Sequence, residues 1–504
     1  MARAKKNPEQ DIAARYQKLL QVTRFRPSQS NRNQTLSIEA ASDRGRILFS
    51  NAFRRLQSKT QVFDQELNAS VRTRLTHSLE VASVGRYLAD VAAREMLKKG
   101  WLGPLGNEET LDVSSAVVTF VEVACLMHDL GNPPFGHFGE STLQAWFENH
   151  QDKFCAKFSK NKRTKFESLY RDFRHFDGNP QGFRIATKLQ WVKDEHGYNL
   201  THTQLAAMLK YPWTPDHVGQ KRDGKTIKKA GAFYSEEEVI KGVYSALEMN
   251  VGTRHPLAYL MEASDDISYC LSDIEDAFEK NVIRGHDFVD WLRKKLGGTT
   301  SGAVSKILSN LPEDADATVE NESRFAWYVK FRTDVTNTLV NEAANLFIQH
   351  QEDILKGLYF DLLDRCDTAK QILGAVKDFS TEHLYTSRVV RQRELLAFEV
   401  ITGILDRFGA LLDLPSNQAY ELITGKHVKN PEHILAPTLC SFLGKKQVLA
   451  YRYATDVNSG TSEEREFGEW FARTHLLVDY VSGMTDDYAI ASFQRLYAGG
   501  PRYI

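Results

Sequence analysis

The chain has 504 residues, a formal net charge of −1 at pH 7, and a composition of 42% hydrophobic and 26% charged residues. This balance is typical of a soluble globular protein and excludes a disordered chain, and the small net charge means that any anionic ligand must be bound by local basic clusters. The five cysteines contain no C-x-x-C pair, which argues against a disulfide framework or a thiolate zinc site and suits a reducing cytosol. Because the N-terminal segment has no apolar signal-peptide region and no uninterrupted apolar run approaches membrane-spanning length, we expect a cytoplasmic protein.

Helical periodicity runs through nearly the whole chain. Residues 72–97, 114–131 and 256–280 each carry apolar residues at the spacing of one helical face. His77 lies on such a face in the first of these segments, and His128 lies on one in the second. Strict two-residue alternation is hard to find, so we predict an all-α fold, a helical bundle with few or no strands.

The segment 114–131 is followed by a sharp break. Its apolar run reaches His128 and Asp129, and the sequence Gly-Asn-Pro-Pro then begins at Gly131, which predicts a helix C-cap at that glycine. His137 and Glu140 follow the break. In the later segment 256–280, one stripe is apolar, and a second stripe that points largely away from it consists of Asp265, Tyr269 and Asp273.

Four of these residues have the side chains of a metal site. Imidazole nitrogens and carboxylate oxygens from His77, His128, Asp129 and Asp265 suit Mn²⁺, Fe²⁺, Zn²⁺ or Mg²⁺. From the residues alone, the alternative for His77 is a satisfied core histidine, and the alternative for Asp265 is a helix surface charge. A second His-Asp pair, His286-Asp287, has no further ligand types around it and serves as an internal control.

The order His77, His128-Asp129, Asp265 resembles the H…HD…D signature of the HD superfamily of metal-dependent phosphohydrolases. Five segments resemble, in the same order, those of bacterial deoxyguanosine triphosphate triphosphohydrolases: "SDRGRILFSNAFRRLQSKTQVF" (42–63), "VRTRLTHSLEV" (71–81), "MHDLGNPPFGHFGE" (127–140), "MEASDDISYCLSDIEDA" (261–277) and "DYVSGMTDDYA" (479–489). The resemblance is strong over 42–280, thinner toward the C-terminus and absent from the first forty residues.

This resemblance implies a reaction and a catalytic pair. The family cleaves a deoxynucleoside triphosphate between the 5′ oxygen and the α-phosphorus, which releases a deoxynucleoside and tripolyphosphate, with a divalent metal ion, Mg²⁺ or Mn²⁺, as cofactor. His137 and Glu140, three residues apart, suit proton transfer to the leaving oxygen or from the attacking water. The alternative is a structural loop histidine capped by Glu140.

The resemblance also implies substrate contacts. The expected substrate-binding residues are Gln61, Val62, Arg74, Lys210, Tyr211, Lys229, Tyr269, Asp273 and Glu394. Arg74, Lys210 and Lys229 are the candidates for the phosphates, because the chain has no P-loop motif. For Lys229 the alternative is a solvated charge in a basic loop.

The remaining contacts concern the sugar and the base. Gln61 and Val62 match the family's sugar-pocket segment, Tyr269 can stack under the deoxyribose and exclude a 2′-hydroxyl, and Asp273 can accept a hydrogen bond from the sugar or base. Glu394 aligns with a guanine-contacting glutamate, and a carboxylate is the right acceptor for guanine N1–H and N2–H₂. The alternative for Glu394 is a surface helix charge.

One position departs from part of the HD group. Some animal members carry a lysine directly after the last metal aspartate, whereas here that position is Asp266. The doubled acid matches the bacterial guanine-specific branch. A phosphate-binding lysine is therefore missing, and we expect Lys210 to replace it.

We predict three regions: an N-terminal extension over 1–40, an HD phosphohydrolase core over 41–280, and a C-terminal helical region over 281–504 that completes the nucleotide pocket. The core contains a polar insertion at about 150–235.

The expected partners are dGTP and, by family resemblance, further copies of the chain in a homo-oligomer such as a hexamer. Single-stranded DNA is a further candidate, with basic clusters at 159–165 and 221–229 to bind it. Two alternatives remain open. One is a different HD phosphohydrolase acting on nucleoside monophosphates, cyclic nucleotides or guanosine polyphosphates, and the other is a nucleic-acid-binding regulator with a vestigial HD site.

Overall fold

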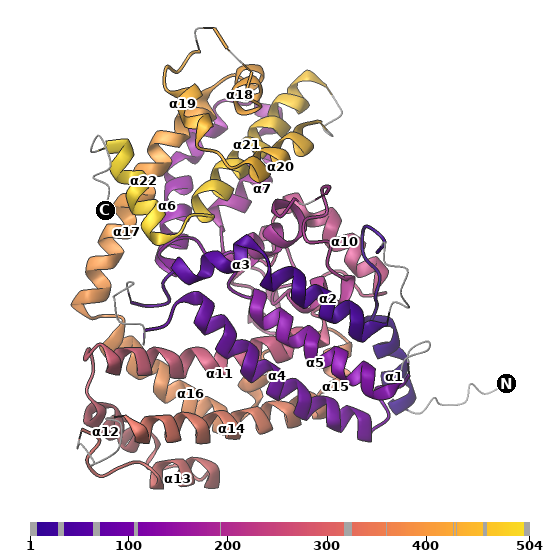
Figure 1. Cartoon of the computed structure of the whole chain (residues 1–504), viewed down its shortest axis with the longest axis vertical. Helices are drawn as coiled ribbons and strands as arrows, with labels where there is room; N and C mark the ends of the chain where they lie inside the picture. Colours follow the sequence, from indigo (N-terminus) through magenta and orange to yellow (C-terminus); the bar gives the residue numbers. More distant parts are fainter. Residues whose placement is uncertain are drawn as a thin grey trace, which may run out of the picture.

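Helices dominate the structure of this chain, a computed structural model (Figure 1). It describes residues 8–28, 35–63, 71–104, 109–191, 193–316, 325–358, 360–426, 428–429, 431–456 and 461–497. In this part of the chain the strands are limited to β1 (Lys221–Arg222) and β2 (Lys225–Thr226), an antiparallel hairpin in which Lys221 pairs with Thr226. The prediction of an all-α fold is confirmed.

The first of two hydrophobic cores is built mainly by helices from the N-terminal half and the middle of the chain. These helices are α1 (Pro8–Leu19), α2 (Leu36–Leu48), α3 (Asn51–Arg55), α4 (Arg74–Lys98), α5 (Thr110–Met127), α8 (Gly178–Arg184), α9 (His202–Ala207), α10 (Glu237–Ala246), α11 (Pro256–Glu279), α12 (Gly285–Leu296), α13 (Gly302–Ser309), α14 (Ala326–Gln349), α15 (Gln351–Leu355) and α16 (Asp367–Phe379). The central helices α4, α5 and α11 pack against one another.

The second core combines two early helices with the C-terminal ones. Its members are α6 (Gly136–Cys155), α7 (Arg163–Arg174), α17 (Arg388–Gly409), α18 (Ser416–Ile423), α19 (Ala436–Ser441), α20 (Lys445–Asp456), α21 (Ser462–Ser482) and α22 (Asp486–Tyr497). In Figure 1 the orange and yellow C-terminal helices gather with α6 and α7 at the top, away from α4, α11 and α14. The chain therefore crosses from the first core to the second immediately after α5.

Single turns of 3₁₀ or π helix link these elements. They are η1 (Leu56–Ser58), η2 (Lys160–Lys162), η3 (Ile185–Leu189), η4 (Pro215–His217), η5 (Tyr234–Glu236), η6 (Leu362–Arg365), η7 (Ser380–Leu384) and η8 (Ala410–Asp413). The predicted three-region division stays a prediction, and residues 1–7 and 29–34 of the predicted extension lie outside the described residues.

Helix α5 differs from its prediction in two ways. It ends at Met127, and its C-cap is His128, three residues before the predicted C-cap at Gly131. The reason is a series of tight turns, in which Leu130 N–H donates to the Met127 carbonyl and Asn132 N–H to that of Asp129. The helix is also long and apolar enough to span a membrane, with a mean hydropathy of 1.6, contrary to the expectation from the sequence. Two thirds of it are buried, which is the behaviour of a core helix.

The crossing from α5 to α6 is tightly packed. A Cβ on Gly131 would lie 2.0 Å from the carbonyl oxygen of Gly178, so only glycine allows this approach to α8. Phe135, the N-cap of α6, has a φ of 62°, a left-handed conformation that costs a non-glycine residue about 1–2 kcal/mol. Because such strain persists only where the surroundings hold it, the segment 128–136 is positioned by its contacts.

Candidate active site

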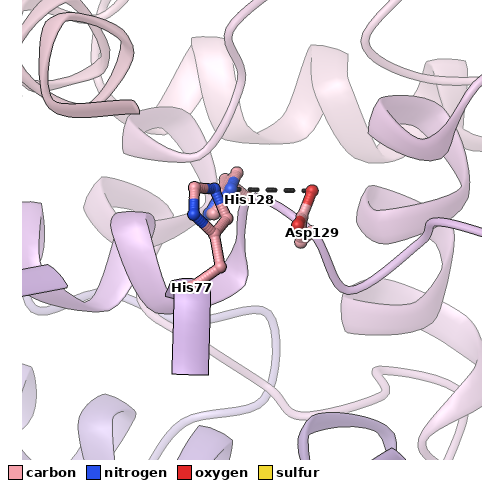
Figure 2. A group of neighbouring side chains, drawn as sticks. All are labelled: His77, His128 and Asp129. Atoms are coloured by element: carbon pink, nitrogen blue, oxygen red, sulfur yellow. Dashed lines mark ion pairs between the residues drawn. The ribbon is translucent and has the colours of Figure 1, made fainter. Parts of the chain in front are cut away.

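Three ligand-type side chains meet where α4 faces the end of α5. One nitrogen of His77, one of His128 and one carboxylate oxygen of Asp129 lie within 4.8 Å of one another, and Figure 2 shows the three side chains converging. Asp265 of α11 completes the group, because its Oδ1 lies 3.7 Å from His77 Nε2 and 3.5 Å from His128 Nε2. Ligands that share a metal ion at about 2.1 Å lie roughly 3–4 Å apart, so these distances fit a divalent cation.

His128 is oriented as a metal ligand. Its Nδ1 lies 2.6 Å from the Cys125 carbonyl oxygen, which accepts a hydrogen bond only if Nδ1 carries the proton. The lone pair is then on Nε2, a buried atom without a hydrogen-bond partner among the described residues. Metal-bound histidines commonly show this arrangement, in which a carbonyl fixes the tautomer.

Asp129 is held by two neighbours. Arg74 Nη1 donates to its Oδ2 at 2.8 Å, and Asn132 Nδ2 donates to its Oδ1. Burial alone would raise the pKa of this carboxyl, but the positive charge of the Arg74 guanidinium outweighs burial and lowers it. Asp129 therefore stays an anion.

Asp265, like Asp129, is a carboxylate with a lowered pKa. Burial would raise its pKa, but His128 and the Lys210 ammonium, whose Nζ lies 3.5 Å from Oδ2, lower it well below the usual range. Its predicted alternative, an exposed helix charge, does not fit a carboxylate whose side chain is 21% exposed and faces two histidines.

His137 and Glu140 form a pair on the first turn of α6. His137 Nδ1 lies 2.8 Å from Glu140 Oε2, while Glu140 Oε1 accepts a hydrogen bond from Gly178 N–H at 2.7 Å. The hydrogen bond with Glu140 raises the pKa of His137. Burial would raise the pKa of Glu140, but the hydrogen bond from His137 and the charge of Lys229 outweigh it, so the pKa is lowered. The imidazolium–carboxylate form of this pair is therefore favoured.

The ligands and the pair open onto one cavity of about 310 Å³, which is in the usual size range of ligand pockets. Among the residues predicted from the sequence, all but Asp273 line it: Gln61, Val62, Arg74, His77, His128, Asp129, His137, Glu140, Lys210, Tyr211, Lys229, Asp265, Tyr269 and Glu394. The structure thus brings together side chains from both cores.

The basic residues of the cavity are paired with acids. Lys229 Nζ lies 2.6 Å from Asp177 Oδ2 and 4.0 Å from Glu140 Oε2, so it is not an isolated solvated charge. Lys210 lies between Asp265 and Glu262, whose Oε1 is 4.0 Å away. An incoming polyphosphate would compete with carboxylates for these cations.

Tyr269 and Asp273 are joined by a residue that the sequence did not indicate. Tyr385 donates a hydrogen bond to Asp273 Oδ2 at 2.7 Å, and its hydroxyl lies 2.5 Å from that of Tyr269. Burial raises the pKa of Asp273 to about 6. Asp273 therefore lies behind Tyr385 rather than on the cavity wall.

Several other lining residues were missed by the sequence reasoning. They are Asn132, Phe135, Phe138, Asn179, Asp266, Tyr385, Val390, Arg393 and Ala397. Asn132 could have been predicted from the Gly-Asn-Pro-Pro break, because this turn directs the side-chain amide of Asn132 at Asp129. Tyr385 and Arg393 lie in a part of the sequence without a motif.

The control dipeptide behaves as expected from its sequence context. His286 is the second residue of α12, it is not among the residues that line the cavity, and its side chain is 46% exposed. It pairs with Asp287 and Asp316 at the surface.

Comparison with known proteins gives matches over most of the chain. The HD domain family model matches residues 74–197. A deoxyguanosinetriphosphate triphosphohydrolase of Yersinia enterocolitica is 34% identical over 501 residues, which cover 94% of this chain and 96% of that protein. A probable deoxyguanosinetriphosphate triphosphohydrolase of Pseudomonas aeruginosa is 36% identical over 485 residues, 92% of this chain and 94% of that protein. The Yersinia pestis (strain Pestoides F) enzyme of the same name is 34% identical over 504 residues, with coverage of 94% and 96%.

Proposed function

The chain belongs to the family of deoxyguanosinetriphosphate triphosphohydrolases, and we propose that it hydrolyses dGTP to deoxyguanosine and tripolyphosphate. One observation carries this proposal: a cluster of two histidines and two aspartates opens onto the same cavity as a histidine–glutamate pair and three basic side chains. The cavity thus offers an acid–base pair and polyanion contacts next to a metal site.

His77, His128, Asp129 and Asp265 would hold the divalent cation, Mg²⁺ or Mn²⁺. When bound, it supplies Lewis-acid chemistry, which neutralises phosphate charge and makes water more acidic. Arg74 fixes Asp129 for this role by its hydrogen bond to Oδ2, and the Cys125 carbonyl fixes His128.

His137 would exchange a proton with the reacting oxygens through Nε2, because Nδ1 is committed to Glu140. Its raised pKa keeps a proton available near neutral pH, which suits protonation of the leaving 5′ oxygen. Glu140 stabilises the imidazolium, and Gly178 N–H prevents its carboxylate from turning away.

The remaining residues would bind the nucleotide. Arg74, Lys210, Tyr211 and Lys229 are proposed for the phosphates, with Lys210 in place of the lysine that Asp266 replaces. Gln61, Val62 and Tyr269 are proposed for the deoxyribose, and Glu394 for the guanine edge. Asp273 would bind the sugar only after Tyr385 gives up its hydrogen bond.

Partners and location are part of the same proposal. We expect a cytoplasmic homo-oligomer, such as a hexamer. Single-stranded DNA has less support at the 221–229 cluster, because Lys225 pairs with Asp361 and Asp364 and Lys229 pairs with Asp177.

Product analysis tests the proposal. The four dNTPs are incubated separately with Mg²⁺ and with Mn²⁺, and the phosphorus products are resolved by ³¹P NMR. Tripolyphosphate and deoxyguanosine from dGTP are the expected products. Release of orthophosphate or pyrophosphate, or turnover of nucleoside monophosphates only, would assign the site to a different HD phosphohydrolase.

A further inference from the structure

The first residue of α22 contacts segments of the chain that line the cavity. Asp486, the first residue of α22, is 4% exposed, and its carboxylate contacts three separate parts of the chain. Its Oδ2 accepts hydrogen bonds from the backbone N–H and the hydroxyl of Thr60 and from Arg393 Nη2. Its Oδ1 accepts a hydrogen bond from Phe135 N–H at 3.0 Å.

Each of these partners is next to a residue that we assign to substrate binding or catalysis. Thr60 directly precedes Gln61 and Val62, and Arg393 directly precedes Glu394. Arg393 Nη1 also donates to the Val62 carbonyl at 2.9 Å, which links the sugar segment to α17. Phe135 is the N-cap of α6, two residues before His137.

The contact with Phe135 has a particular consequence. Phe135 and Gly136 both adopt positive φ values, 62° and 60°, and this backbone sets the direction in which α6 leaves the turn. A hydrogen bond from the strained residue to a buried carboxylate holds the conformation that aims His137 and Glu140 at the cavity.

We propose that Asp486 is a positioning residue for dGTP hydrolysis. Its carboxylate fixes three parts of the site relative to one another: the deoxyribose-binding residues Gln61 and Val62, helix α17 with Glu394, and the start of α6 with His137 and Glu140. This inference rests on the proposed function. Asp486 does not line the cavity, so it acts through its partners Thr60, Arg393 and Phe135.

The chain contains a matched control. Asp43 is also fully buried, and it too accepts hydrogen bonds from a threonine N–H, the same threonine's hydroxyl and an arginine, in this case Thr201 and Arg24. None of these three residues lines the cavity. An effect of Asp486→Asn that comes from stability alone should therefore also appear in Asp43→Asn.

The experiment measures the melting temperature, kcat and KM for dGTP and dATP in both variants, with the wild-type chain as reference. We expect both to lower the melting temperature. Asp486→Asn should lower kcat for dGTP by about 10- to 100-fold, the size of losing a hydrogen bond to a charged group, and should raise KM and shrink the preference for dGTP. Asp43→Asn should leave kcat and KM within about threefold, the scatter of a distant substitution.

Two milder variants keep the test open if Asp486→Asn does not fold. Thr60→Val removes only the hydroxyl donor, and Arg393→Lys retains the charge without the paired geometry. Both should raise KM for dGTP, and Arg393→Lys should reduce the dGTP:dATP preference. Equal kinetics in the Asp43 and Asp486 variants, or wild-type kinetics in both milder variants, would overturn the inference. A wild-type chain that does not cleave dGTP would refute the proposed function instead.

Discussion

Replacing His137 separates chemistry from binding. The His137 side chain is 68% exposed, and its charged partner in the structure is Glu140. Without His137, Glu140 keeps the hydrogen bond from Gly178 N–H and the nearby charge of Lys229, so the surroundings of the metal cluster stay in place. We expect His137→Ala to retain metal and nucleotide binding and to lose about 10²- to 10⁴-fold in kcat, the usual contribution of a general acid or base.

Glu140 contributes through His137, and its effect is smaller. A hydrogen bond to a charged group contributes about 1.5–3 kcal/mol when buried, and solvent around the exposed imidazole reduces this to about 1 kcal/mol. Glu140→Gln should therefore lower kcat about fivefold, since 1.4 kcal/mol corresponds to about tenfold.

The pH profile distinguishes the two roles. A general acid must be protonated, and the hydrogen bond with Glu140 raises the pKa of His137, so kcat should fall as pH rises through that raised pKa. Removing the carboxylate charge lowers the pKa of His137, so in Glu140→Gln the alkaline limb should move to lower pH.

Steady-state kinetics from pH 5.5 to 9 and dGTP binding by calorimetry are the required measurements. An alkaline limb that stays in place in Glu140→Gln would show that His137 is not the group that titrates. Loss of dGTP binding in His137→Ala would make it a binding residue, and the catalytic interpretation would be wrong.

Three further predictions address the metal, the base and the packing. Asp265→Ala should abolish both bound metal, measured by elemental analysis, and hydrolysis, whereas His286→Ala should retain both; equal effects of the two substitutions would refute the metal site. Glu394→Ala should reduce the ratio of kcat/KM for dGTP to that for dATP by about 10- to 100-fold, because a charged acceptor for the guanine edge is lost, and an unchanged ratio would assign base recognition elsewhere. Gly178→Ala should lower thermal stability by about 1–3 kcal/mol and reduce kcat, because its Cβ would lie 2.0 Å from Asn132 Oδ1 and 3.0 Å from Glu140 Oε1. Gly182→Ala, whose Cβ meets nothing closer than 3.4 Å, is the control in the same helix, and an equal loss there would point to helix α8 as a whole.

Much of the fold could be predicted because the spacing of apolar residues along a helix indicates which face of the helix is buried. The apolar stripe of α11 is buried as expected, and α4 begins within two residues of its predicted start. The end of α5 was not predictable from Gly131, because a glycine predicts a stop without saying how many residues the preceding turns occupy.

The site could be predicted where a residue with metal-binding or acid–base chemistry also lies at a recognisable position in the sequence pattern. His128 and Asp129 carry their own signal, and His77 was conspicuous as a histidine on an apolar face. Tyr385 and Asp486 have no such pattern around them, because their roles depend on contacts with residues that are distant in the sequence. Asp273 illustrates the same limit: its stripe on α11 was correct, but its position behind Tyr385 depends on a residue 112 positions away.

The dependence of the cavity on α17 and α22 has a consequence for protein synthesis. A ribosome that has completed α11 has already produced every proposed metal ligand, but neither Glu394 nor the carboxylate of Asp486 yet exists. Because translation proceeds from the N-terminus, a chain released early by a nonsense codon would carry the four proposed metal ligands without an assembled guanine pocket. Consumption of a DNA precursor would then begin only with the finished polypeptide, and truncated products would not drain the dGTP supply of a replicating cell.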